Sequence, residues 1–93
     1  MDIEYILEEL KPLDYHRETK CLTLIFDKEI TIFLREWEDN ELMWHVFENK
    51  QSIDAGTDEE EKIIPMLKRY LNEFKLLRHE RRNKIFQKSA KRI

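Results

Sequence analysis

The residues best suited to proton transfer or metal binding are three histidines, His16, His45 and His79, which lie far apart in the sequence. Zinc sites usually draw on closely spaced pairs of His or Cys, and no such pair occurs here. We therefore expect no metal site and no cofactor. His45 could face Glu36 as a proton-transfer pair, but nothing else converges there, so a histidine without a catalytic role is the stronger interpretation.

Carboxylates gather around one predicted turn, at Glu36, Glu38, Asp39 and Glu41. Two such groups can divide acid and base roles only if their surroundings separate their pKa values, and side chains at an exposed tip are poorly placed for that. Gly56 is the single glycine, so no glycine-rich loop is present to hold a phosphate. We predict that the chain is not an enzyme and has no small-molecule substrate.

Cys21 is the only cysteine, and a lone cysteine is most often a small buried hydrophobic residue. It cannot form an internal disulfide, and the chain has neither a basic-then-apolar leader nor a long apolar run. These features predict a cytoplasmic protein with no membrane partner.

Charge is divided unevenly along the chain, whose 17 basic and 20 acidic residues leave a net charge of −3. Residues 1–65 carry 18 acidic and 7 basic side chains, whereas residues 66–93 carry 2 acidic and 10 basic ones. The basic end could neutralise phosphates, which makes nucleic-acid binding the alternative function. Its candidate contacts are Arg78, Arg81, Arg82, Lys84, Lys88, Lys91 and Arg92.

The pattern of apolar residues predicts a single α+β domain in the order helix, three-stranded antiparallel meander, long helix (αβββα). Asp2 can cap a helix over residues 3–10 that ends before Pro12. Residues 11–20 are expected to form a loop, and strands are expected at about 21–26, 30–38 and 42–48. Residues 51–56 are expected to link the sheet to a helix that begins with a capping box at Thr57. We expect residues 1–77 to be compact and residues 78–93 to form a basic helical extension or a frayed tail.

The register of the sheet decides which residues share a face. A two-residue loop at Asp39 and Asn40 pairs Trp37 with Leu42, Arg35 with Trp44 and Phe33 with Val46. The joint before Ile30 can have two or three residues, and these lengths place Leu22, Leu24 and Phe26 on opposite faces. We expect the helices to cover one face and leave the other for a partner. The expected interface consists of Phe33, Arg35, Trp37, Leu42 and Trp44, with the acidic tip residues Glu38, Asp39 and Glu41.

Two resemblances follow from this order of elements. It resembles the double-stranded RNA-binding domain, but that family has lysines at the start of its second helix, where this sequence has Asp58, Glu59, Glu60 and Glu61, so RNA binding is not carried over. In size, charge and element order the chain is similar to small acidic proteins of bacteriophages and mobile elements, including some anti-CRISPR inhibitors. This second resemblance implies a compact body that binds and inhibits a host protein. We therefore expect a protein partner or a second copy of the chain.

Overall fold

In the computed structural model, which describes residues 1–27 and 29–74, the chain begins with helix α1 (Ile3–Leu10), as predicted. The Asp2 side chain caps this helix by accepting a hydrogen bond from the Tyr5 backbone N–H at 3.2 Å. Lys11, directly before Pro12, ends it with a left-handed φ of 51°. Ile6 and Leu10 are buried, so packing against the sheet holds this short helix in place.

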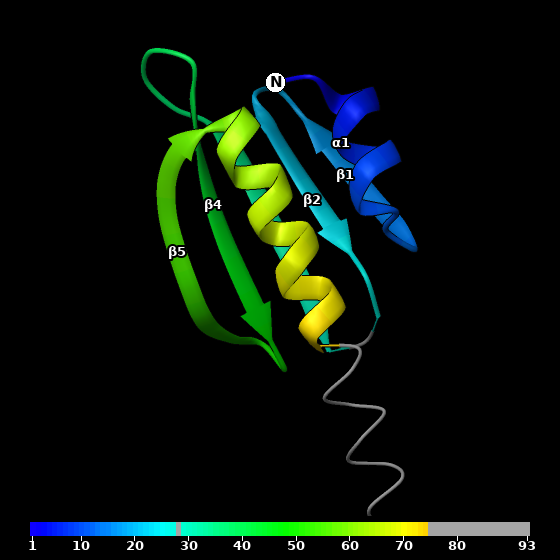
Figure 1. The fold of residues 1–93 in the computed structure, drawn as a ribbon. Coiled ribbons are helices and arrows are strands. Elements are labelled where there is room, and N and C mark those ends of the chain that lie inside the picture. The colour runs from blue at the N-terminus through cyan, green and yellow to red at the C-terminus, as the bar shows by residue number, and fades with distance from the viewer. Residues whose placement is uncertain (28, 75–93) are drawn as a thin grey trace, which may run out of the picture.

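Five antiparallel strands follow and form one sheet in the order β1-β2-β3-β4-β5 (Figure 1). The central strands β2 (Cys21–Ile25), β3 (Ile30–Glu36) and β4 (Glu41–Glu48) lie close to the predicted ranges. The prediction of three strands is wrong, because β1 (Asp14–Glu18) occupies the expected loop and β5 (Gln51–Glu59) occupies the expected linker.

Both additional strands lie at the edges of the sheet, which explains why the sequence pattern did not reveal them. Every residue of β1 and all of β5 except Gly56 are exposed, so neither strand has an alternation of apolar and polar residues. A tight turn with positive φ at Asn49 (52°) and Lys50 (65°) joins β4 to β5. Another turn, with φ 62° at Lys20, joins β1 to β2.

The second helix begins at residue 60 and is described as far as residue 74. The prediction that it begins at Thr57 is wrong, because Thr57 pairs with Met43 in the β4–β5 ladder and the strand continues to Glu59. The helix buries the predicted apolar stripe at Ile63, Ile64, Leu67 and Leu71. The expected continuation to residue 77 and the boundary at residues 77 and 78 lie outside the described residues.

The register differs from the predicted one by a single residue. Asp39 and Asn40 do adopt the positive φ expected of them, at 46° and 64°. However, the loop contains one more residue, so Leu34 rather than Arg35 lies opposite Trp44. A slip of one residue transfers every side chain of a strand to the other face, so Leu42, Trp44 and Val46 join the inner face.

The hydrophobic core lies between the inner face of the sheet and the two helices, which cover that same face (Figure 1). Leu22 and Leu24 pair with Leu34 and Ile32. Of the two arrangements that the joint before Ile30 allows, the structure therefore has the one that places Leu22 and Leu24 on the inner face. The sheet contributes Leu22, Leu24, Ile30, Ile32, Leu34, Leu42, Trp44 and Val46 to this core. The alternation of buried and less buried residues along β3 and β4 is typical of a sheet covered on one side.

Candidate protein-binding face

The outer face of the sheet points away from both helices, which lie on the other side of the sheet (Figure 1). Its middle row runs His16, Thr23, Phe33, His45 and Ala55 across the five strands. The two adjacent rows run Asp14, Ile25, Thr31, Phe47, Ser52 and Glu18, Cys21, Arg35, Met43, Thr57. We call these three rows, together with the neighbouring pair Glu41 and Glu59, the open face.

Large side chains of the central strands form the middle of the open face. Phe33, Met43, His45 and Phe47 are half-buried, although both helices lie on the other face of the sheet. Ile25 beside them is 37% exposed. In a sheet with one face in water, apolar and polar residues alternate and the outer positions are polar. This outer face therefore carries more apolar surface than such a sheet usually has.

His45 is held firmly within this apolar centre. Its ring stacks on that of Phe47, with centroids 4.2 Å apart and an interplanar angle of 22°. Its Nε2 shares a hydrogen bond with the Ser52 hydroxyl on β5. A Ser–His pair can act as nucleophile and base when a third group orients the imidazole. Within the described chain no acid forms a hydrogen bond with the other ring nitrogen of His45, so these contacts fix a surface rather than build a triad.

Charged side chains surround the apolar centre. Asp14 and Glu18 lie on β1 at one edge, and Glu41 and Glu59 lie opposite each other on β4 and β5 at one end. Arg35 is the basic residue of the open face, while the His16 imidazole contacts Glu18 at 3.2 Å. The rim of the open face is therefore mainly acidic.

The residues of the predicted interface do not lie together in the structure. Phe33 and Arg35 do lie on the open face, but Leu42 and Trp44 are core residues with only 3% and 9% of their surface exposed. The predicted pairing of Arg35 with Trp44 is wrong, because Arg35 lies opposite Met43 and Trp44 lies opposite Leu34, on the other face of the sheet. Sequence reasoning missed Ile25, Met43, His45 and Phe47, although Met43, His45 and Phe47 follow the period of two expected for one face of a strand.

Trp37 lies at the end of the sheet, outside the open face, and is 48% exposed. It lines a recess of about 280 Å³ together with Met1, Glu36, Asn40, Glu41, Leu42 and Glu60. The predicted tip residues Glu38 and Asp39 are exposed in the adjacent turn. Carboxylates around an indole could attract a cation.

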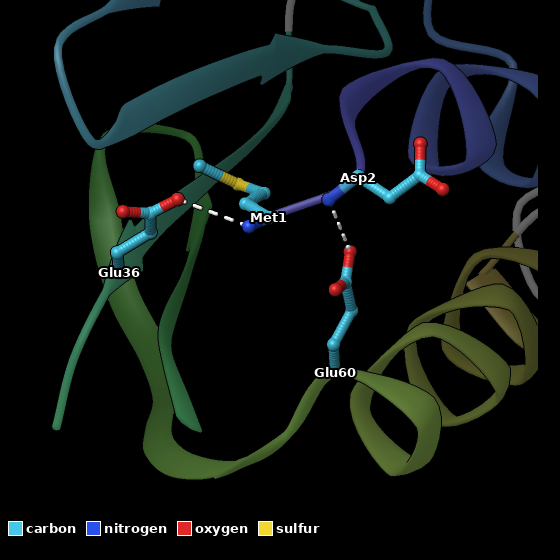
Figure 2. Close-up of polar contacts among 4 residues, drawn as sticks. All are labelled: Met1, Asp2, Glu36 and Glu60. Atoms are coloured by element: carbon cyan, nitrogen blue, oxygen red, sulfur yellow. Dashed lines mark hydrogen bonds and ion pairs between the residues drawn. The ribbon is translucent and has the colours of Figure 1, made fainter. Parts of the chain in front are cut away.

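Two of the recess carboxylates already have structural roles (Figure 2). The Met1 amino group lies 3.0 Å from Glu36 Oε1, and the Asp2 backbone N–H donates to Glu60 Oε1 at 2.9 Å. The Met1 side chain is 2% exposed, so the N-terminal residues are anchored between β3 and the second helix. Glu36 also lies on the inner side of the register, opposite Leu42, whereas His45 lies on the outer face. The two side chains therefore do not form the proton-transfer pair that the sequence analysis considered and did not favour.

The predicted nucleic-acid contacts all belong to the part of the chain after residue 74. Arg78, Arg81, Arg82, Lys84, Lys88, Lys91 and Arg92 lie outside the described residues. Among residues 1–27 and 29–74, no group of three or more His, Cys, Asp or Glu side chains could hold a metal ion. In the same part of the chain, no helix has the length and apolar character needed to cross a membrane.

Comparisons with protein-family models, with curated proteins and with solved structures each found no match. The open face and its acidic rim are therefore the features from which a function is inferred.

Proposed function

We propose that the chain is a small, non-catalytic protein-binding module that contacts its partner through the open face. The observation that carries this proposal is the one-sided covering of the sheet. Both helices pack on the inner face, yet the outer face still carries Phe33, Met43, Phe47 and Ile25 around His45. Contiguous apolar patches on a protein surface often mark an interaction site, because burying them against a partner removes them from water.

The arrangement of the polar residues supports binding over catalysis. Glu36 and Glu60 of the recess anchor the N-terminal residues, and the His45–Ser52 pair lies on the outer face of the sheet. An active site would combine a concave, mostly apolar pocket with converging polar groups. The proposal includes a cytoplasmic setting and, by the resemblance to small phage and mobile-element proteins, inhibition of a host protein.

The test compares proteins captured from a cytoplasmic extract by three immobilised forms of the chain. Phe33→Ser with Phe47→Ser alters the open face, while Leu13→Ser with Met66→Ser alters two exposed apolar residues elsewhere. Circular dichroism first checks that all three forms are folded. We expect the wild type and the Leu13/Met66 variant to retain the same proteins and the Phe33/Phe47 variant to lose them. Equal capture by all three forms would contradict the proposal.

Nucleic-acid binding remains the second candidate function, because residues 75–93 carry eight basic side chains and one acidic side chain. Such binding would weaken steeply with salt as counterions are released. A gel-shift assay at low salt, with the full chain and with a chain truncated after residue 77, separates the two functions. Binding that disappears on truncation would favour nucleic acid, and no shift at low salt would exclude it.

A further inference from the structure

The electrostatics of the open face restrict the chemistry of its partner, provided that the proposed function is correct. Four carboxylates, Asp14, Glu18, Glu41 and Glu59, share this face with the single guanidinium of Arg35. Asp14, Glu18 and Glu59 are exposed, so their charges act on an approaching molecule. They lie at the edges and one end of the sheet, whereas the apolar residues lie in the middle.

The rest of the folded body has the same sign of charge. Residues 1–74 contain 19 acidic and 9 basic side chains, a net charge of −10, although the whole chain has only −3. A second copy would bring its own acidic rim against this one, and a nucleic acid would bring phosphates. Like charges brought together across an interface oppose association, and opposite charges accelerate it.

We propose that the open face binds a protein surface in which basic side chains surround an apolar patch. The apolar centre of the partner would cover Phe33, Met43 and Phe47. Its lysines or arginines would lie against Glu18 on one side and Glu59 on the other. Arg35, an exposed residue near the end of the central strand β3, would fix the orientation by contacting a hydrogen-bond acceptor at one point of the partner.

The size of the face indicates how much this charge matters. Five strands spaced by about 4.8 Å, each presenting roughly 17–25 Å of length, give an area of about 400–600 Å² per partner. Stable interfaces typically bury about 800 Å² per partner, so this contact is at the small end of the range. We therefore expect association to depend strongly on charge and to weaken in salt.

Two designed peptides probe this chemistry directly. Each is an amphipathic helix with a leucine stripe, flanked by lysines in one peptide and by glutamates in the other, and binding is followed by fluorescence anisotropy. Glu18→Lys with Glu59→Lys reverses charge on the open face. The matched control, Glu8→Lys with Glu61→Lys, makes the same change in net charge on exposed helix positions.

We expect the wild type to bind the lysine peptide at least about tenfold more tightly than the glutamate peptide. The Glu18/Glu59 variant should lose this preference and the Glu8/Glu61 variant should keep it. Equal losses in both variants, or equal binding of both peptides, would overturn the inference. Sedimentation showing a dimer that Phe33→Ser with Phe47→Ser dissociates would also overturn it. So would a labelled DNA duplex that binds the wild type and is not bound by the Phe33/Phe47 variant.

The two proposals can fail separately. If capture from extract depends on Phe33 and Phe47 but the peptides show no preference by charge, the open face binds a protein of different chemistry and only this inference fails. If capture does not depend on the open face, the proposed function itself fails, whatever the peptides show.

Discussion

Adding a single methyl group at Gly56 should destabilise the protein, because the Trp44 indole lies directly over this glycine. A Cβ atom at position 56 would lie 2.9, 3.1 and 3.3 Å from Trp44 Cζ2, Cε2 and Nε1. Favourable carbon–carbon contacts lie at about 3.5–4.0 Å, so the indole would have to move by roughly half an ångström or more within a packed core.

Overpacking of this kind costs about 1–3 kcal/mol, while replacing glycine within a strand recovers about 0.5–1 kcal/mol. We therefore expect Gly56→Ala to lower the free energy of unfolding by about 1–2 kcal/mol, measured by urea denaturation with circular dichroism. Shortening the indole in Trp44→Phe should remove most of that cost, giving a coupling energy of about 1 kcal/mol or more in a double-mutant cycle.

The matched control uses the second tryptophan. Trp37 is 48% exposed at the end of the sheet, so Trp37→Phe and Gly56→Ala should be additive. Additive effects of Gly56→Ala and Trp44→Phe would refute the register of β4 against β5. They would also refute the assignment of Trp44 to the inner face.

Two further predictions concern the inner side of the fold. Burial, and secondarily the nearby charge of Glu48, raises the pKa of Tyr70 to about 12 from its ordinary value of 10.0, so the folded protein keeps this proton at a pH where the unfolded chain loses it. The free energy of unfolding should therefore fall between pH 10 and about 12, by about 1 kcal/mol after allowance for solvent screening of a half-buried hydroxyl. The Tyr70→Phe variant should lack this fall when the free energy of unfolding is measured against pH. An unchanged slope in that variant would contradict the prediction. Asp2→Ala should lower the free energy of unfolding by about 1 kcal/mol, measured by thermal denaturation, because the Tyr5 N–H loses its capping acceptor. Asp2→Asn should retain most of the stability. Equal losses in the two variants would argue against the cap.

The sequence predicts those elements whose apolar periodicity is strong. Helix α1 has Ile6 and Leu10 on one side and a clear cap at Asp2, and its predicted bounds are confirmed. The central strands are rich in β-branched and aromatic residues, which favour a pleated surface. The second helix reveals its stripe in the same way, but its start was misplaced because backbone pairing of Thr57 with Met43 prevails over a local cap.

The candidate site was harder to predict from the sequence, because its residues depend on whether one loop has two or three residues. Asp39 and Asn40 indicate a turn whether the loop has two or three residues, since both lengths use positive φ. With one more residue in this loop, Met43 takes the place of Trp44 on the outer face. The edge strands gave no signal, so the contributions of Glu18 and Glu59 to the acidic rim could not be foreseen.

The most direct measurement is an NMR map of the ¹⁵N-labelled chain as it binds a protein captured from the extract. We expect the largest changes in the amide signals of Phe33, Met43, His45 and Phe47 and of their neighbours in the three rows. The signals of the exposed helix residues Glu8 and Glu61 should change little. Changes concentrated on the helices or around Trp37, with the open-face signals unaffected, would contradict the claim that this face is the binding surface.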